Sequence, residues 1–349
     1  MSSTIQAISS SPTSTTSATP SCITFTPGKD GYVPSYACNA QWSYSPSFGA
    51  ALFFAIAFGI SLALHIFQAF YFKKWKLTWV LIMGVTWEFI AFAGRSFGSK
   101  HQQSFAAAYV SQIFLLLAPM WVNAFIYMVL GRMIYFFVPA QKIWGFKGIK
   151  IAKIFVWLDV VSFLTQLGGG LLIQPNQDQK TLMMGIHIYM GGIGFQEACI
   201  LLFAAIAAKF LITMKKQERA NSAGNFVLDG RPTNWGPLLY TLFASLVLIT
   251  IRIIFRMVEF AAGDDPDKNP IPYTEAYLLA LDALPMLLCV FLLNLIHPGR
   301  VLQGENSEFP KGPTRKQKKE IKRAKKAEKA AKKQTKKDGR SFVEMNNMV

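Results

Sequence analysis

Six charged side chains lie inside long apolar stretches of this sequence, and their types suit ion pairing, proton transfer or the binding of a charged ligand. Three are acids and three are bases: Glu88, Arg95, Arg252, Arg256, Glu259 and Asp282. A charged side chain in hydrocarbon costs several kcal/mol unless it is paired or hydrated. These six residues are therefore the first candidates for a functional site.

The spacing of these residues places them on shared helix faces. Glu88 and Arg95 are seven residues apart, which is two helical turns. Arg252, Arg256 and Glu259 follow one another at intervals of four and three residues, which also puts them on one face. Helix faces that carry both signs of charge predict ion pairs between neighbouring helices.

Depth along the helices brings three of these residues to one level. At about 1.5 Å of rise per residue, Glu88, Arg256 and Asp282 all lie well inside the same end of their stretches. The six charges sum to zero, as a low-dielectric interior favours. We therefore predict a neutral layer of ion pairs in which Arg256 is bonded to Asp282. Such a layer is either a structural lock between helices or a pair that opens to admit a substrate head group.

Two further acids, Asp159 and Glu197, lie apart from this layer. Neither has a basic residue three or four positions away in the apolar part of its helix. If transport is driven by protons, they are candidate carriers; the alternative is a carboxyl that is simply hydrogen-bonded. Small and amide residues in the same two helices favour close packing, or a broken helix that lines a cavity. They are Gln166, Gly168, Gly169, Gly170, Gly191, Gly192, Gly194 and Gln196.

Seven apolar stretches position these residues. Each is close to or above the ~20 residues that a helix needs to cross a ~30 Å hydrocarbon core. Hydrophobic types make up 52% of the chain and Phe occupies 29 positions, well above a soluble domain's usage. We predict an all-α membrane protein with seven transmembrane helices. The stretches run from Phe48 to Phe72, Leu77 to Phe97, Phe105 to Phe136, Ile151 to Ile173, Thr181 to Met214, Pro237 to Ala262 and Glu275 to His297.

The helices form one predicted domain, residues 48–298, between two polar flanks. Residues 1–47 are rich in Ser, Thr and Pro, and residues 299–349 are dominated by Lys. Neither flank has enough apolar surface to offset the entropy lost on ordering, so the first is expected to be a disordered segment and the second a polar tail. No apolar run precedes the first helix, which is expected to act as its own insertion signal.

Charge in the connections predicts the orientation, because Lys and Arg concentrate on the cytosolic side. The connections after the first, third and fifth helices carry thirteen basic residues, against four on the other side. From Arg300 onward, the tail has 16 Lys and Arg but only 6 Asp and Glu, so it belongs with the basic connections. We expect the N-terminus outside and the C-terminus in the cytosol.

The Lys-rich tail supplies much of the chain's net charge of +17 and predicts a membrane partner rather than nucleic acid. Tethered at the cytosolic face, it lies beside anionic inner-leaflet lipid. Each Lys or Arg held near that surface contributes about 1 kcal/mol. The alternative is a solvated tail that aids topology and solubility.

The four cysteines divide into two pairs by location. Cys22 and Cys38 lie in the segment expected outside the membrane, where an oxidising compartment permits a disulfide between them. Cys199 and Cys289 lie within helices and are expected to be small packing residues.

Motifs for enzymatic chemistry are absent from the sequence. The histidines show no HxxxH or HExxH spacing, so no metal site is predicted. No Walker motif is present, so ATP hydrolysis by this chain is not expected. We expect neither a cofactor nor an enzymatic activity. The histidines are His65, His101, His187 and His297.

An ordered set of short polar motifs runs from residue 44 to residue 299. The set comprises Tyr44-Ser45-Pro46-Ser47, His65, Glu88, Gly94-Arg95, Gln112, Ala118-Pro119, Tyr127, Leu130-Gly131-Arg132, Phe155, Asp159, Ser162, Gln166, Gly168 to Gly170, Gly191, Gly192, Gly194, Gln196, Phe255-Arg256, Glu259, Glu275, Asp282, Pro285-Met286 and His297-Pro298-Gly299. Taken together it resembles the fungal lipid-translocating exporter family, which includes aminocholesterol-resistance proteins and a sphingoid long-chain-base exporter. The sequence departs from the family pattern at Ala91-Phe92-Ala93, which affects local packing.

The resemblance implies a multi-pass protein of the plasma membrane or a related fungal membrane. It implies that the protein moves amphipathic lipids such as sphingoid bases and sterol-like amines, or gives resistance to them. These ligands have a cationic head and an apolar tail, so Glu88, Glu259 and Asp282 are candidate contacts for the head. The substrate-binding or transport candidates are Glu88, Arg95, Gln112, Asp159, Gln166, Glu197, Arg252, Arg256, Glu259 and Asp282.

A seven-helix lipid sensor or receptor, which regulates membrane composition without transport, is the alternative. Arg132, at the end of the third helix, resembles a receptor's switch position. No acid precedes it, however, and Asn294 lacks the Pro-x-x-Tyr that receptors carry there.

Overall fold

The computed structural model describes residues 23–34, 37–173, 178–220, 227–228, 231–232, 234–261, 270–303, 309, 319–320, 323–324 and 327. The chain divides into two compact units, residues 1–304 and residues 305–349. In the second unit, residues 319–320, 323–324 and 327 are helical. The elements that hold the candidate residues all belong to the first unit.

Seven helices of the described residues are long and apolar enough to cross a membrane, which confirms the predicted all-helical class. The first six are continuous, and a π-helical turn interrupts the seventh. The six are α1 (Phe48–Tyr71), α2 (Trp75–Lys100), α3 (Phe105–Phe137), α4 (Gly148–Leu172), α5 (Gln179–Ala220) and α6 (Gly236–Ala261). The seventh span comprises α7 (Glu275–Leu278), η3 (Leu279–Ala283), α8 (Leu284–Leu295) and α9 (Pro298–Val301).

Short polar side chains fix where several helices begin. The Ser47 hydroxyl accepts a hydrogen bond from the Ala50 N–H at the start of α1, and Ser104 does the same for Ala107 in α3. Such caps satisfy backbone donors that have no partner within the helix. Asp178, outside the spans, accepts from the Thr181 hydroxyl and N–H at 2.6 and 3.2 Å. These bonds hold the pKa of the Asp178 carboxyl below its usual range.

Two short hairpins and two 3₁₀ turns complete the described secondary structure. β1 (Lys142–Ile143) pairs antiparallel with β2 (Phe146–Lys147), and β3 (Val227–Leu228) pairs with β4 (Arg231–Pro232). The first hairpin turns at Trp144 and Gly145, both with positive φ, as a two-residue turn that follows strand twist requires. The 3₁₀ turns are η1 (Lys29–Gly31) and η2 (Ile271–Tyr273).

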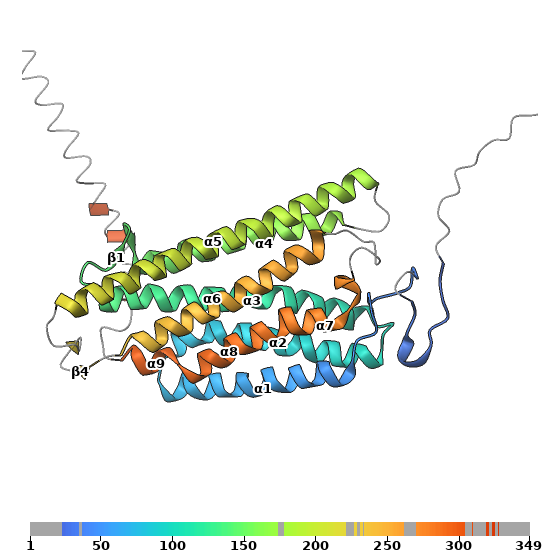
Figure 1. The fold of residues 1–349 in the computed structure, drawn as a ribbon, viewed down its shortest axis with the longest axis horizontal. Helices are drawn as coiled ribbons and strands as arrows, with labels where there is room; N and C mark the ends of the chain where they lie inside the picture. Colours follow the sequence, from blue (N-terminus) through green and yellow to red (C-terminus); the bar gives the residue numbers. More distant parts are fainter. Residues whose placement is uncertain are drawn as a thin grey trace, which may run out of the picture. The chain divides into compact units, whose positions relative to one another are not determined.

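The helices pack largely with their neighbours in sequence. α2 lies between α1 and α3, α4 packs against α3 and α5, and α6 packs against α5 and α8. Contact between α1 and α8 closes the bundle. Figure 1 shows α4 and α5 running side by side on the face of the bundle opposite α1. α6 and the seventh span thus connect α5 on one side of the bundle with α1 on the other.

Helix α5 continues beyond the apolar stretch that was predicted for it. The stretch was expected to end at Met214, but α5 extends to Ala220. The added turn is Lys-Lys-Gln-Glu-Arg, a run of good helix formers that needs no burial to remain helical.

Two glycines let α4 and α5 approach closely. A Cβ at Gly192 would lie 2.8 Å from Gln166 Cγ and 3.0 Å from Gln166 N, and a Cβ at Gly169 would lie 2.5 Å from Tyr189 N. The interpretation of these glycines as packing residues is therefore confirmed at both positions. A Cβ would meet nothing within 4 Å at Gly168, Gly191 and Gly194.

The N-terminal segment packs onto one end of the bundle, which composition alone did not predict. A Cβ at Gly98 would lie 2.6 Å from Trp42 Cζ2. Gln102 donates from its side chain to Ser45 Oγ at 3.0 Å and from its N–H to the Asp30 carbonyl at 2.9 Å. The contact arises because aromatic and hydroxyl side chains precede the first helix. We refer to this end, where α1 begins, as the N-terminal end of the bundle.

Three of the four cysteines lie among the described residues. Cys38 is disulfide-bonded, while Cys199 and Cys289 are buried free thiols. Cys22, the partner expected for Cys38, lies outside the described residues.

Candidate functional site

A buried ion-pair network joins α6 to the seventh span. Arg252 Nε and Arg256 Nη2 donate to the two oxygens of the Asp282 carboxylate. Arg256 Nη1 also donates to Glu259 at 2.8 Å. Asp282 is fully buried, and both arginines are nearly so. The predicted pair between Arg256 and Asp282 is confirmed. Because Arg252, Arg256 and Glu259 follow one another at intervals of four and three residues, they lie on one face of α6 and join the same network.

The seventh span presents Asp282 from a π-helical turn. This turn, η3, covers Leu279–Ala283 and lies between two α-helical segments. Pro285 follows it closely and has no N–H to donate to a preceding carbonyl, so regular α-helical bonding is already interrupted there. Single π-helical turns inside α-helices occur frequently at functional sites. No pattern in the sequence predicted this turn.

Helix α3 contributes a backbone acceptor to the network through a proline. Pro119 lies inside α3 and has no N–H, so the carbonyl four residues earlier, that of Leu115, loses its helical donor. Arg252 Nη2 donates to the Leu115 carbonyl at 2.9 Å. The proline therefore leaves the Leu115 carbonyl free to accept from Arg252, and this bond ties α6 to α3.

A second charged pair lies at the N-terminal end of the bundle. Arg95 Nε donates to Glu275 Oε1 at 3.4 Å, and Arg95 Nη2 donates to the Tyr44 hydroxyl. The guanidinium also lies over the rings of Trp42 and Tyr44, 5.2 and 5.3 Å from their centroids. The other oxygen of Glu275 accepts from the Ser47 N–H at 2.7 Å. The N-terminal segment thus supplies part of the environment of a membrane-embedded arginine.

Glu88 does not join an ion pair, which corrects the sequence prediction. Its side chain is fully buried, and neither carboxyl oxygen has a hydrogen-bond partner among the described residues. It is near enough to Arg252, Arg256 and Asp282 to interact with them electrostatically. Arg95, two turns from Glu88 on α2, pairs instead with Glu275. The reason is geometric, since Arg95 points toward the start of the seventh span rather than down its own helix.

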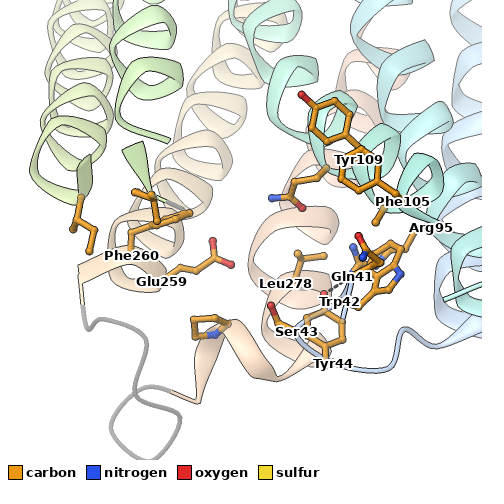
Figure 2. A pocket seen from close by; sticks show the side chains of 15 residues that line it. Gln41, Trp42, Ser43, Tyr44, Arg95, Phe105, Tyr109, Glu259, Phe260 and Leu278 are labelled. Atoms are coloured by element: carbon orange, nitrogen blue, oxygen red, sulfur yellow. Dashed lines mark hydrogen bonds between the residues drawn. The ribbon is translucent and has the colours of Figure 1, made fainter. Parts of the chain in front are cut away.

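A cavity of about 400 Å³ opens beside the two charged pairs. Figure 2 shows Glu259 and Phe260 on one side of it and Arg95 on the other. Its walls are mainly apolar and aromatic, and they include Gln112, one of the predicted candidates. Glu259 joins this cavity to the buried network, because the same carboxylate that lines it bonds to Arg256. Apolar walls with a few charged groups are typical of a small-molecule site.

Within the part of the chain that the structure describes, Asp159 and Glu197 are hydrogen-bonded rather than ion-paired. Asp159 accepts from the Tyr127 hydroxyl at 3.0 Å and from Asn123 Nδ2 at 3.3 Å. Glu197 accepts from the Thr250 hydroxyl at 3.0 Å. The absence of a basic residue three or four positions away therefore indicated correctly that these acids form no ion pair within their helices. Neither acid lines the cavity described above.

The amide pair of α4 and α5 borders the arginines across a small space. Gln166 Nε2 donates to Gln196 Oε1 at 2.9 Å and to Ser162 Oγ at 3.0 Å. A cavity of about 30 Å³, roughly the size of one water molecule, is lined by both glutamines and by Arg252 and Arg256. Gln166, one of the predicted transport candidates, thus lies beside the ion-pair network.

Sequence reasoning missed three contributors to the site: Trp42, Tyr44 and, as an ion-pair partner, Glu275. The two aromatic residues lie in a segment whose composition indicated disorder. Glu275 lies at the first residue of its span, where a charge has little cost and so gives no signal. Among the described residues, no group of three or more His, Cys, Asp or Glu side chains is placed to hold a metal.

Seven apolar helices with buried ion pairs between them define a polytopic integral membrane protein. The chain belongs to the family described as RTA1 like protein, whose pattern matches residues 81–305. The matched region includes every charged residue of the network. No solved structure matches the chain.

Several named fungal proteins are similar to this chain. The "Probable lipid transporter atnI" of Emericella nidulans is 43% identical over 302 residues, which cover 86% of this chain and 78% of that protein. The "Lipid-translocating exporter-like protein RTA1" of Leptosphaeria maculans is 27% identical over 288 residues, 76% of this chain but only 52% of that protein. The "Sphingoid long-chain base transporter RSB1" of Saccharomyces cerevisiae is 24% identical over 290 residues, covering 74% of this chain and 73% of that protein.

Proposed function

We propose that this protein transports amphipathic lipids that combine a cationic amine with an apolar tail, such as sphingoid bases and sterol-like amines. The names of its relatives support lipid transport. The observation that carries the proposal is Glu259, which lines the apolar cavity and at the same time bonds to buried Arg256. This places an exchangeable negative charge beside a surface fit for a hydrocarbon chain.

In the proposed mechanism, the ammonium group of the lipid replaces Arg256 as the partner of Glu259. Arg256 keeps its bond to Asp282, so its guanidinium retains a carboxylate partner during the exchange. The lipid tail lies against the apolar wall formed in part by Phe105, Tyr109 and Phe260.

We propose further that the N-terminal end of the bundle faces the outside and that the protein resides in the plasma membrane. The distribution of Lys and Arg in the connections supports this orientation. In this arrangement the cavity opens in the outer half of the membrane. Lipid released there enters the outer leaflet or the medium, which would confer resistance to toxic lipid amines.

The proposal predicts that Glu259→Gln weakens transport of a sphingoid base in liposomes that contain the purified protein. Loss of one charge-assisted hydrogen bond costs about 1.5–3 kcal/mol. The concentration of lipid that gives half-maximal flux should therefore rise about tenfold or more. Flux of a fluorescently labelled sphingoid base into the vesicles is the measurement.

Glu218→Gln is the matched control. Glu218 accepts from the Trp235 indole at 2.7 Å and lies at the other end of the bundle. A glutamine oxygen preserves that bond, so the half-saturating concentration should stay at the wild-type value. Equal flux by wild type and Glu259→Gln would contradict the role of Glu259. Saturable binding without flux in the wild type would instead indicate the alternative function, a lipid sensor.

A further inference from the structure

Glu88 differs from the other acids of the network in having no bonded partner. It lies in the middle of α2 with 0% of its surface exposed, and both carboxyl oxygens lack a hydrogen-bond partner among the described residues. A buried ionised carboxylate without a partner is strongly unfavourable. The groups around Glu88 therefore decide whether its carboxyl is neutral or ionised.

The groups around Glu88 come from several elements. Arg252 and Arg256 of α6, Asp282 of η3 and the Cys289 thiol of α8 interact with it electrostatically. α1 carries no Asp, Glu, Lys or Arg, and the single charged residue of α3 is Arg132, near the other end of that helix. Within α2 the nearest charge is Arg95, two turns away.

The charges of this network balance without Glu88. Three guanidinium groups face three carboxylates: Arg95 pairs with Glu275, while Arg252 and Arg256 share Asp282 and Glu259. Ionised Glu88 would add a fourth negative charge in a low-dielectric interior. Charge balance in this arrangement therefore favours a protonated Glu88.

Loss of that proton would change the pairing of Arg252. Arg252, which bonds to Asp282, also interacts electrostatically with Glu88. A carboxylate at Glu88 competes with Asp282 for this guanidinium, and the bond between α6 and η3 weakens. Asp282 is then neutralised by Arg256 alone, which leaves the negative charge of Glu259 for a lipid ammonium to neutralise. Two arrangements follow: a protonated Glu88 with Asp282 bound by both arginines, and an ionised Glu88 with Glu259 available to a cation.

We propose that Glu88 is the proton-exchanging group of the transporter, so that one proton is exchanged for one lipid cation. The proton leaves the Glu88 carboxyl for water as the ammonium enters the network, and it returns from water as the ammonium leaves. Net charge in the interior stays at zero throughout. This inference rests on the proposed transport function and assigns its coupling to Glu88 rather than to Asp159 or Glu197.

The test measures accumulation of a labelled sphingoid base in liposomes across an imposed pH gradient, with accumulation in protein-free vesicles subtracted. Exchange of one proton supports up to about a tenfold change in the accumulation ratio for each pH unit. We expect the wild type to respond in this way and Glu88→Gln to give a ratio that no longer depends on the gradient. Glu218→Gln, which keeps its bond to Trp235, should respond like the wild type.

Proton release provides a second measurement, because a substitution at a buried position can prevent folding. The wild-type protein in detergent and weak buffer receives saturating sphingoid base while a pH-sensitive dye reports on the solution. We expect release of about one proton per chain, and none from folded Glu88→Gln. No release from the wild type would overturn the inference without the use of any variant.

The outcomes separate this inference from the proposed function. If the wild type moves no lipid amine under any gradient, the transport function itself fails. If the wild type transports but its accumulation ignores the gradient, or if Glu88→Gln responds as the wild type does, only the role of Glu88 is overturned.

Discussion

At the residue scale, a single carboxylate organises the interior of this protein. Asp282 accepts from two arginines that lie one helical turn apart, and all three side chains are at least nine-tenths buried. Removal of one member of a buried ion pair leaves an uncompensated charge and costs about 3–5 kcal/mol. The stability of this region therefore depends more on the balance of charge around Asp282 than on the number of its contacts.

We predict that Asp282→Asn lowers the free energy of unfolding in detergent by about 3–5 kcal/mol. The amide retains the shape of the side chain but leaves one guanidinium charge uncompensated. Adding Arg252→Met restores the charge balance, so the double variant should be more stable than Asp282→Asn alone. Unfolding by denaturant, followed by tryptophan fluorescence, gives the comparison as a double-mutant cycle. Additive effects of the two substitutions would show that the residues are not coupled.

At the element scale, the bundle depends on where helices come close. Gly192 faces α4, where an added Cβ would meet both the side chain and the backbone of that helix within 3.1 Å. Its neighbour Gly191 is exposed, and a Cβ there would meet nothing within 4 Å. These adjacent glycines therefore form a matched pair for testing close packing.

We predict opposite effects for alanine at these two positions. Gly192→Ala forces α4 and α5 apart and should lower the unfolding free energy by about 1–3 kcal/mol. Gly191→Ala adds helix propensity without a clash and should raise it by up to about 1 kcal/mol. Thermal unfolding of the purified variants in detergent measures both. A similar loss of stability in both variants would contradict the assignment of the close contact to Gly192 alone.

The elements themselves followed from the sequence, because hydrocarbon permits few backbone arrangements. A stretch of about 20 apolar residues must satisfy its backbone internally, so it forms a helix. Helical spacing then gave the shared face of Arg252 and Arg256 and the pair between Arg256 and Asp282. The partner of Arg95 could not be predicted in this way, because it depends on how whole helices are oriented. That partner is Glu275. The π-helical turn at Asp282 and the contact of Trp42 with Arg95 arise from tertiary packing, which leaves no periodic signal.

At the scale of the whole molecule, the charges divide into a neutral interior and a strongly basic tail. The ion-pair network sums to zero with Glu88 protonated, whereas the tail from Arg300 carries 16 basic and 6 acidic residues. The described tail residues 319–320, 323–324 and 327 are helical. A charge of this size close to an anionic membrane favours association through many weak contacts, each of about 1 kcal/mol.

We predict that the tail binds anionic lipid and that salt releases it. In nanodiscs with anionic lipid, tail lysines should react several-fold more slowly with an amine-labelling reagent than in discs of phosphatidylcholine. The difference should vanish between 0.1 M and 1 M salt, because the Debye length falls from about 10 Å to about 3 Å. Peptide mass mapping after brief labelling reports each lysine separately, and Lys100 at the N-terminal end of the bundle is the internal control. Equal labelling of the tail in both kinds of disc would favour the alternative, a solvated tail whose charge acts only on topology. Slow labelling that persists at high salt would mean that the tail is held by apolar contacts, which its composition does not favour.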